Sequence, residues 1–354
     1  MAMDYIRETK DISAEEAIIL WQASRLSLSK SYEKAPEILK VHGSVIGTLG
    51  NFSASIGKAK SKKTFNVSAI VASALSGKEI LKYKAELPSC KNRILYIDTE
   101  QSKCHCHKVL HRILKLAGLP TDQENDNIQF LVLREYTPDQ RRDIIRWALH
   151  EEQNIGLVII DGIRDLIHDI NSPSESLDII NELMRWSSYY ELHIHTVLHL
   201  NKGDDNTRGH IGTELNNKAE TILQISKNNE NGKISEVRAM HIRDREFTPF
   251  AFEIGEDSLP HLAKEHQFKK NKMDRLASYI DMTEQQHRTA LEVAFEECAE
   301  YGYQSLLEAL KKGYESIGYS RGRNTLVNLC KFLLENHAIT KNGRTYSYTP
   351  SFHL

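Results

Sequence analysis

Short apolar runs that alternate with amphipathic stretches constrain the fold more than any other feature of this sequence. Runs that are apolar throughout are typical of strands buried on both faces of a sheet. When helices separate such strands, the usual result is a parallel sheet with helices on both sides. The predicted strands cover 44–50, 52–57, 93–98, 128–133, 156–161 and 193–200, and the predicted helices cover 63–76, 103–117, 138–152 and 174–190.

Two later segments, 220–228 and 235–244, look extended and flank Asn231-Gly232, a pair that favours a hairpin turn. We therefore predict one α/β domain over residues 41–255. Residues 1–40 precede it and predict a polar helical arm, because apolar residues recur at helical spacing between Ile12 and Leu28. Such an arm packs either on a neighbouring subunit or on its own domain.

The end of the chain has a different character. Residues 256–275 are polar and rich in lysine, which indicates a linker. In 276–354, Thr283 and Gln286 have the spacing of a capping box, and three amphipathic helices follow. Asn342-Gly343 then predicts a type I′ hairpin. Three helices and a hairpin in this order predict a winged-helix domain.

Composition excludes several classes of protein. The formal net charge of the 354 residues is −2 and the pI is about 6.8, so the chain is not a globally basic nucleic-acid binder. No apolar run has the roughly 18 residues that a membrane span needs, and the charged N-terminus does not look like an export signal. Five cysteines without framework spacing favour a reduced, cytoplasmic compartment and no membrane partner.

The segment GKAKSKKTF follows a predicted strand and opens a predicted helix, which is the context of a phosphate-binding loop. In the pattern G-x-x-x-x-G-K-[ST], Lys63 contacts the β and γ phosphates and the Thr64 hydroxyl ligates Mg²⁺. Backbone N–H groups of the loop and of the helix N-terminus surround the phosphates. The expected nucleotide-binding residues are Gly57, Lys58, Ala59, Lys60, Ser61, Lys62, Lys63, Thr64 and Phe65.

Lys62 departs from this pattern, because the second glycine belongs at its position. Glycine there allows the backbone to approach phosphate closely. A lysine side chain must instead point away or contact phosphate itself. The alternative interpretation of the whole segment is a solvated, lysine-rich turn.

Two acidic residues follow predicted strands, at the edge where open α/β sheets bind their ligands. Glu100 comes after 93–98, where a carboxylate can orient or deprotonate an attacking water. It can equally be a charge that favours the N-terminus of the next helix. Asp161 ends a strand of four apolar residues, a Walker B pattern that holds Mg²⁺. The alternative for Asp161 is a chance acidic residue at the end of a buried strand.

The strand 193–200 leads into a polar, glycine-containing loop, 203–212. Asn201 is a candidate sensor of the γ-phosphate. The loop can face the central channel of a ring or the next subunit, and Arg208 is a candidate to act there, as a contact to DNA if the loop faces the channel. We expect His195 to be a buried strand histidine. Arg243 and Arg245 lie on one face of a late strand, so either can be an arginine finger delivered to a neighbouring subunit. A solvated edge strand explains them as well.

The last 39 residues carry a local charge of +4, since five basic residues face one acidic residue, Glu335. In a winged helix, the third helix and the hairpin meet duplex DNA. The alternative use of such a domain is contact with protein. The basic residues are Arg321, Arg323, Lys331, Lys341 and Arg344, of which all but Lys331 are the stronger DNA candidates.

Taken in order, the phosphate loop, YIDTEQ, LVIID, HLNK and a basic late strand resemble the RecA/DnaB-like ATPases. The resemblance covers about 40–255 and is nearest to the RepA-type hexameric ATPases and to ATPases of mobilizable and conjugative elements in Bacteroides-like bacteria. It implies a RecA-like core, ATP and Mg²⁺, a ring that is a homo-oligomer, and action on DNA. It also implies Walker A roles for Lys63 and Thr64, the catalytic glutamate for Glu100 and the Walker B aspartate for Asp161.

The sequence thus predicts an ATP-hydrolysing, helicase-like ring protein that acts in replication or mobilization of a mobile element. Single-stranded DNA would pass through the core and duplex DNA would meet the winged helix. A primase, relaxase or initiator of the same element is the expected partner. The alternative is a nucleotide-gated DNA-binding regulator with little ATP turnover.

Overall fold

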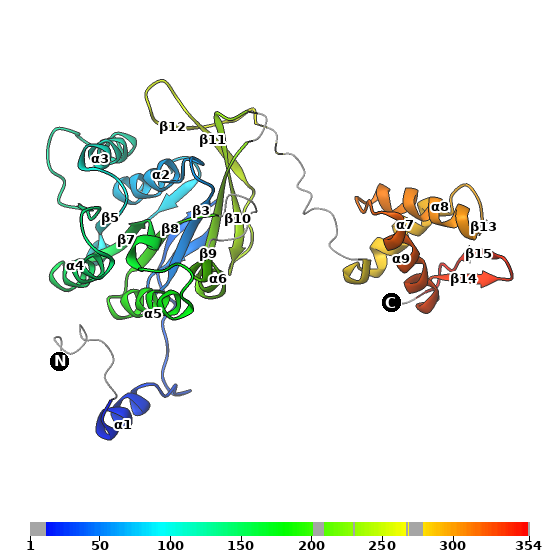
Figure 1. Ribbon diagram of the computed structural model, residues 1–354, viewed down its shortest axis with the longest axis horizontal. Coiled ribbons are helices and arrows are strands. Elements are labelled where there is room, and N and C mark those ends of the chain that lie inside the picture. The colour runs from blue at the N-terminus through cyan, green and yellow to red at the C-terminus, as the bar shows by residue number, and fades with distance from the viewer. Residues whose placement is uncertain (1–11, 201–208, 229–230, 267, 269–278, 353–354) are drawn as a thin grey trace. The chain divides into compact units, whose positions relative to one another are not determined.

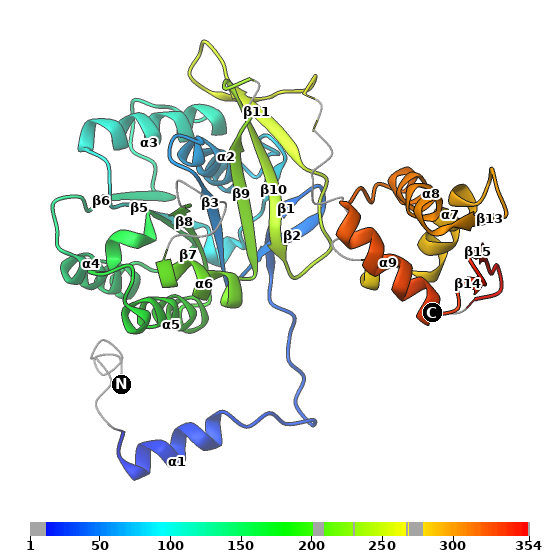
Figure 2. The same cartoon turned by 45° about the vertical axis from the view of Figure 1, so that its right-hand side comes forward.

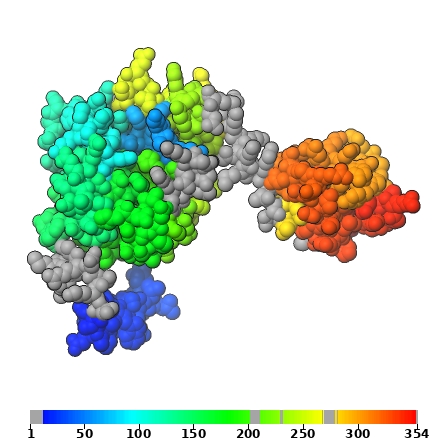
Figure 3. Space-filling model, in the orientation of Figure 1, coloured from blue at the N-terminus to red at the C-terminus, as the bar shows by residue number. Residues whose placement is uncertain are grey.

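The computed structural model describes residues 12–200, 209–228, 231–266, 268 and 279–352. The chain divides into two compact units, Met1–Glu265 and His266–Leu354. The N-terminal unit has two hydrophobic clusters, one on each face of its main sheet, and the C-terminal unit has a cluster of its own. The space-filling view colours the C-terminal unit yellow to red (Figure 3).

A nine-stranded sheet forms the centre of the N-terminal unit, in the order β12-β11-β10-β9-β3-β8-β7-β5-β6. The six strands from β9 to β6 run parallel, and β10 to β12 extend the sheet in antiparallel fashion, as Figure 2 shows for β9, β10 and β11. The strands are β3 (Phe52–Gly57), β5 (Arg93–Asp98), β6 (Ile128–Val132), β7 (Ile155–Asp161), β8 (His193–His199), β9 (Thr221–Lys227), β10 (Ile234–Ile242), β11 (Phe250–Ile254) and β12 (Pro260–Leu262).

Helices cover both faces of this sheet, as Figure 1 shows. One face packs against α2 and α3, and the other packs against α4, α5 and α6. Four of these helices, α2 to α5, begin and end within one residue of their predicted ranges, because apolar periodicity and capping signals fix both ends. Their bounds are α2 (Lys63–Ser76), α3 (Lys103–Ala117), α4 (Pro138–Glu151), α5 (Pro173–Tyr189) and α6 (Gly209–Lys218), with short 3₁₀ turns η2 (Ser89–Lys91) and η3 (Ile163–Leu166).

The run 44–50 is not part of the parallel sheet, which corrects the sequence prediction. It forms β2 (Ser44–Thr48) in a separate antiparallel sheet, with the order β2-β1-β4. Only His42 and Gly43 connect β1 (Glu37–Val41) to β2, and both have positive φ. A connection of two residues joins antiparallel neighbours, so β2 cannot lie parallel to β1. The third strand, β4, covers Tyr83–Ala85.

Three boundaries also differ from prediction. The small sheet begins at Glu37, inside the range expected for the arm, and β12 ends at Leu262, inside the expected linker 256–275. Part of the expected loop 203–212 is helical, because α6 begins at Gly209 and buries Ile211 and Leu215 at helical spacing. The remaining residues of that loop, 203–208, lie outside the described residues.

Within the arm, the helix is shorter than expected. It is α1 (Ala14–Ala23), which starts with a capping box between Ser13 and Glu16 and has no buried residue. Its apolar side chains are exposed, among them Ile19 and Trp21. The described residues of the N-terminal unit therefore do not cover the apolar side of α1.

The described residues of the C-terminal unit form three α-helices and a three-stranded antiparallel sheet in the order β13-β15-β14. The capping box of Thr283 and Gln286 starts its first helix, as the sequence predicts. The hairpin turn lies one residue later than predicted, at Gly343-Arg344, and only Gly343 has positive φ, which fits a type II′ turn rather than type I′. The elements are η5 (Tyr279–Asp281), α7 (Glu284–Ala294), β13 (Glu300–Gly302), α8 (Tyr303–Ser316), α9 (Arg323–Glu335), β14 (Ile339–Asn342) and β15 (Thr345–Tyr348).

Candidate active site

The carboxyl ends of β3, β5, β7 and β8 meet at one edge of the main sheet, beside the N-terminus of α2. Parallel strands all end at the same edge, and loops after the strands carry ligand-binding groups there. A cavity of about 320 Å³ opens at this edge. Its lining includes residues 60–65 of the phosphate loop together with Glu100, Asp161 and His199.

The backbone of the phosphate loop turns through left-handed conformations at two lysines. Lys60 has φ of 64° and Lys62 has φ of 67° and ψ of 32°. Residues other than glycine rarely adopt this region, because Cβ approaches the following carbonyl. The position where the pattern expects glycine thus has the backbone of a glycine although lysine occupies it. The unusual side chain leaves the path of the loop intact.

The Lys62 side chain leaves the loop toward the β9–β10 connection. Its Nζ donates a hydrogen bond to the backbone carbonyl of Lys233. Partial burial lowers the pKa of this amine, and the nearby charge of Lys227 lowers it further. The sequence left two possibilities for the Lys62 side chain: to point away from the phosphates or to contact them. The structure shows the first, because the side chain points to the carbonyl of Lys233.

Lys63 is buried at the centre of the site, with 5% of its surface exposed. Its Nζ donates to the carbonyls of Gly57 (2.8 Å) and Lys58 (3.0 Å) and to His199 Nδ1 (3.0 Å). Burial lowers its pKa to about 8, although the charges of Asp161 and Glu100 oppose the shift. The loop carbonyls therefore hold the Lys63 amine beside the cavity. An anion bound there would raise the pKa of the amine and restore its full positive charge.

Asp161 lies next to the phosphate loop at the end of β7. Thr64 Oγ1 donates to its Oδ2 at 3.0 Å, and the buried Tyr96 hydroxyl donates to the same oxygen at 3.1 Å. Burial raises the pKa of Asp161 to about 6, and the neighbouring charge of Asp98 raises it further, against these two hydrogen bonds. A hydroxyl and a buried carboxylate at this distance fit the hard oxygen ligands of Mg²⁺.

Asp98 is a member of the site that the sequence reasoning missed. It pairs with Asp161 across β5 and β7 and is fully buried. Its carboxylate accepts hydrogen bonds from the N–H groups of Glu100 (3.0 Å) and Gln101 (2.7 Å) and from the Gln101 side chain. Asp98 thus fixes the turn that carries Glu100. The signal was available, since Asp98 ends its strand just as Asp161 does.

Glu100 extends from this turn toward His199, which was not among the predicted site residues. The distance between His199 Nε2 and Glu100 Oε2 is 3.5 Å, and the Glu100 side chain is 60% exposed. Because Lys63 donates to Nδ1, the proton of the neutral ring lies on Nε2 and points at the carboxylate. This hydrogen bond is the main reason that the pKa of Glu100 is lowered. His199 therefore connects the loop lysine to the acidic residue.

The α3 side of the cavity is cationic. The Arg112 guanidinium lies 3.6 Å from the centre of the Phe65 ring, and its buried Nε has no hydrogen-bond partner among the described residues. His105 and Lys108 line the same wall. Within the loop, Ser61 Oγ is also buried without a described partner. Such donors suit a polyanionic ligand.

Other predicted site residues are not at this edge. Arg243 and Arg245 follow β10, whose last residues pair with the beginning of β9, so they lie at the opposite end of the strands from the phosphate loop. Arg243 donates to the carbonyl of Lys218. Neither arginine can reach the cavity at the carboxyl edge of its own sheet. Asn201 and Arg208 lie outside the described residues.

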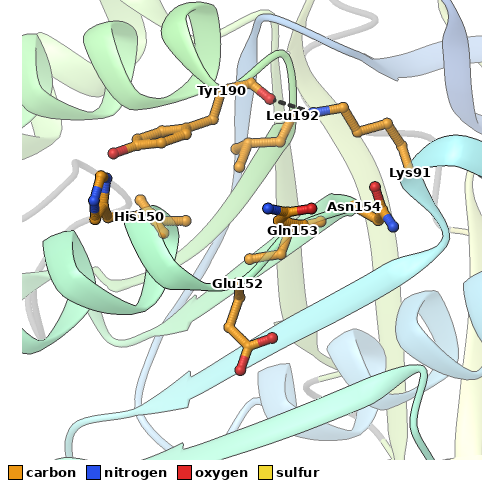
Figure 4. A pocket seen from close by; sticks show the side chains of 9 residues that line it. Lys91, His150, Glu152, Gln153, Asn154, Tyr190 and Leu192 are labelled. Atoms are coloured by element: carbon orange, nitrogen blue, oxygen red, sulfur yellow. Dashed lines mark hydrogen bonds between the residues drawn. The ribbon is translucent and has the colours of Figure 1, made fainter. Parts of the chain in front are cut away.

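A second cavity, of about 230 Å³, lies at the amino ends of β7 and β8 (Figure 4). Lys91, His150, Glu152, Asn154 and Tyr190 surround it. Here Lys91 Nζ donates to the carbonyl of Tyr190 at 2.6 Å. The predicted site residues contribute nothing to this cavity.

The candidate DNA-binding residues of the C-terminal unit lie just before α9, at its start and in the β14–β15 hairpin. Arg321 stacks on Tyr319, with 4.4 Å between guanidinium carbon and ring centre, and Lys341 lies 5.7 Å from the Tyr346 ring. Arg323 opens α9, and Arg344 is exposed in the hairpin turn. The exposed face of the same helix carries Asn324, Asn328 and Lys331.

A family model described as an AAA domain matches residues 31–205. This range contains the phosphate loop, Glu100, Asp161 and His199. The N-terminal unit contains a P-loop ATPase core. As in other P-loop ATPases, nucleotide binding together with Mg²⁺ is the property that such a core carries.

Two other comparisons concern less of the chain. The curated Endoribonuclease YbeY of Fusobacterium nucleatum is 26% identical over 131 residues, which are 34% of this chain and 79% of that protein. A crystal structure of the RadB recombinase is 17% identical with a TM-score of 0.43, and the match covers 59% of this chain and 90% of that one. Neither likeness is strong enough to assign an activity.

No helix among the described residues is long and apolar enough to cross a membrane. Likewise, the described part of the chain contains no group of three or more His, Cys, Asp or Glu side chains that could hold a metal ion without further ligands. The magnesium site predicted at Thr64 and Asp161 is of a different kind, because phosphate oxygens and water would complete such a site.

Proposed function

We propose that this chain is a RecA-like ring ATPase that hydrolyses ATP and acts on DNA, as a helicase-like factor in replication or mobilization of a mobile element. The observation that carries the proposal is the meeting of Lys63, Thr64, Asp161 and the Glu100–His199 pair at one edge of a parallel sheet. These are the groups that phosphoryl transfer requires: a phosphate cation, metal ligands and a carboxylate for the attacking water.

The roles follow from the geometry. The carbonyls of Gly57 and Lys58 hold the Lys63 amine beside the cavity, and the amine leaves them to contact the terminal phosphates. Thr64 and Asp161 hold Mg²⁺, which neutralises charge on the phosphates when it is bound. Glu100 accepts the proton of the attacking water. Arg112, Lys108 and Phe65 form the wall for the rest of the nucleotide.

His199 takes the role of the nucleotide sensor in this proposal, beside or in place of Asn201. Its ring contacts both Lys63 and Glu100. A γ-phosphate that draws the Lys63 ammonium away frees Nδ1, and the ring then reorients Glu100. Binding at the loop is thereby converted into a movement of the residue that activates water.

Assembly into a ring explains the position of the two arginines. Arg243 and Arg245 lie at the edge of the sheet opposite their own phosphate loop, so they serve a neighbouring subunit or none. A charge delivered across a subunit boundary stabilises the transferring phosphoryl group. A closed homo-oligomer, hexameric in this proposal, gives every site one such neighbour. Arg208 then contacts single-stranded DNA in the channel.

The C-terminal unit has the element order of a winged helix, and we propose that it binds duplex DNA. Support comes from the basic residues at the start of α9 and in the hairpin, and from the exposed face with Asn324, Asn328 and Lys331. Asparagine amides read adenine in the major groove, and lysines contact phosphate or guanine. A contact to a primase, relaxase or initiator is the alternative use of this surface.

The rival proposal, a nucleotide-gated regulator with little turnover, rested on Lys62. The left-handed backbone at Lys62 and the outward course of its side chain favour hydrolysis, because the loop keeps the shape that glycine would give it.

The deciding experiment measures ATP hydrolysis with and without single-stranded DNA, together with negative-stain images in ATP. DNA-stimulated turnover by closed rings supports the proposal. Tight ATP binding without turnover in either condition would favour the regulator.

Duplex binding is tested with Arg321→Ala combined with Arg323→Ala. The loss of two phosphate contacts should reduce the log–log salt slope by about 1.8. The matched control changes the exposed Lys311 and Lys312 of α8 to alanine, which removes the same charge elsewhere on the unit. Equal effects of the two pairs would assign binding to net charge rather than to α9.

A further inference from the structure

Four polar side chains form a continuous row inside the core, between β3 and β8. We name Ser53, Ser55, His193 and His195 the histidine–serine seam. All four are at most 1% exposed. Ser53 Oγ lies 2.7 Å from His193 Nε2 and 2.8 Å from His195 Nδ1, and Ser55 Oγ lies 2.8 Å from His195 Nε2. Neither the proposed chemistry nor ordinary apolar packing requires such a row.

The direction of every hydrogen bond in the seam follows from His193, whose ring lies at the end of the seam next to β2. His193 Nδ1 lies 2.9 Å from the Thr48 carbonyl, which can only accept, so this nitrogen carries the proton. Its Nε2 then accepts from Ser53, Ser53 accepts from His195 Nδ1, and His195 Nε2 accepts from Ser55. Both rings are neutral, and burial lowers the pKa of His195 to about 3. Each buried donor and ring nitrogen therefore has one defined partner.

The small antiparallel sheet leaves space for the His193 ring at Gly47. A Cβ atom at Gly47 would lie 2.9 Å from His193, so only glycine allows β2 to cover the ring. At the other end, the seam points along the strands to the phosphate loop. Side chains two residues apart share a face, so Ser53, Ser55 and Gly57 on β3 lie opposite His193, His195, Val197 and His199 on β8.

Lys63 contacts the ends of both strands that the seam joins. Its Nζ bonds to the carbonyl of Gly57, the last residue of β3, and to His199, the last residue of β8. Gly57 and His199 are direct register partners. The backbone hydrogen bonds of a parallel pair could also form in a shifted register, but the three directed side-chain bonds between the serines of β3 and the histidines of β8 form in one register only.

We propose that the histidine–serine seam is a positioning device, which sets β8 against β3 so that His199 reaches Lys63 and Glu100 together. The seam residues touch no substrate, and they act through His199. This inference rests on the proposed ATPase function, because it assigns the seam to the geometry of that same site.

The test is a double-mutant cycle in the full-length protein. Ser53→Ala breaks the two central bonds of the seam, and His199→Ala removes the residue through which it acts. We expect Ser53→Ala to reduce kcat about tenfold with nucleotide affinity nearly unchanged, since small misplacements of catalytic groups carry costs of this size. In the His199→Ala background, Ser53→Ala should reduce kcat less than twofold further.

Ser73→Ala is the matched control. Ser73 is a fully buried serine of α2 that bonds to the carbonyls of Lys78 and Tyr83, away from β8. It should lower the melting temperature as Ser53→Ala does but leave kcat unchanged. Ring-nitrogen NMR shifts, assigned to His199 with the alanine variant, give a readout without turnover. The wild type should show the proton on Nε2, and Ser53→Ala should show a mixture of tautomers.

The outcomes separate the two levels of inference. If the wild type neither binds nor hydrolyses ATP, the proposed function fails. If the wild type hydrolyses ATP but Ser53→Ala costs the same in both backgrounds, the seam only stabilises the fold and the inference is wrong. Should Ser53→Ala not fold, Ser55→Ala removes one end of the seam and is judged by the same cycle.

Discussion

The two edges of the main sheet carry cavities of comparable size, about 320 and 230 Å³, built by the same parallel strands. Each cavity contains a lysine that donates to backbone carbonyls, Lys63 at the carboxyl edge and Lys91 at the amino edge. At the amino edge, the charge of Glu152 is paired with Arg93. At the carboxyl edge, burial acts against the charged forms of both Lys63 and Asp161.

The difference teaches that cavity size alone does not identify a site in this fold. The direction of the parallel strands identifies the candidate site, because the loops after these strands and the N-terminus of α2 meet at one edge only. The same edge holds ionisable groups in environments that disfavour their charges, an arrangement that a charged ligand relieves. Four predictions test this contrast between the two edges of the sheet.

The largest effect is expected for the two lysines. Lys63→Ala should weaken ATP binding by at least about 100-fold, since it removes the phosphate-contacting charge. Lys91→Ala should leave nucleotide affinity unchanged. Titration with a fluorescent ATP analogue measures both. Similar losses in the two variants would mean that the contrast between the edges is wrong.

The next effect concerns two carboxylates. Glu100→Gln should retain ATP binding and lose about 100-fold in turnover, because the amide keeps the shape of the side chain without its basicity. Glu152→Gln, at the amino edge, is the control and should turn over ATP at the wild-type rate. Steady-state hydrolysis gives kcat for both variants. Wild-type turnover in Glu100→Gln would assign that residue to the N-terminus of α3 instead.

An intermediate effect is expected from pH. Asp161 has a pKa of about 6 in the folded protein against 3.8 for an ordinary aspartate. The Mg²⁺-dependent part of ATP binding should therefore fall about tenfold for each pH unit below 6. The folded state binds the extra proton, so without ligand this residue favours folding more as pH falls from 6 towards 4. Thr64→Ala should weaken Mg²⁺ dependence at every pH, and a wild-type profile without an inflection near pH 6 would contradict the assignment.

The smallest effect belongs to Lys62. Lys62→Gly should stabilise the protein by about 1 kcal/mol, because glycine adopts positive φ without strain. Glu191, near the amino edge, has φ of 47°, so Glu191→Gly is the control for the backbone effect. Thermal melts should rise in both variants, while only Lys62→Gly should change the hydrolysis rate, upwards. A fall in ATP affinity in Lys62→Gly would show that the lysine contacts phosphate after all.

Much of this contrast was accessible from the sequence. The strands before Gly57, Asp98 and Asp161 are short and mostly apolar, so their ends and the loop lysine could be placed from the sequence alone. Periodicity also fixed α2 and α3. The run at 44–50 misled because a buried antiparallel strand has the same composition as a parallel one, and only the two-residue turn at His42-Gly43 separates the cases.

The partners of individual side chains could not be predicted. His199 and His195 occupy the same face of one strand and looked alike in the sequence, yet one contacts Lys63 and the other lies between two serines. Each role depends on residues more than 130 positions away along the chain. The backbone at Lys62 was equally hidden, because the sequence shows the missing glycine but not the conformation that lysine adopts there.

The buried state of Lys63 has a consequence for chemical reactivity. An amine with a pKa of about 8 is half unprotonated at pH 8, whereas an ordinary lysine is almost entirely charged. The neutral amine is the nucleophilic form, so small acylating reagents that enter the cavity should modify Lys63 ahead of the exposed lysines of the chain. A bound polyphosphate would restore the charge and protect it. Mass spectrometry of the labelled protein would thus map the occupied nucleotide site directly.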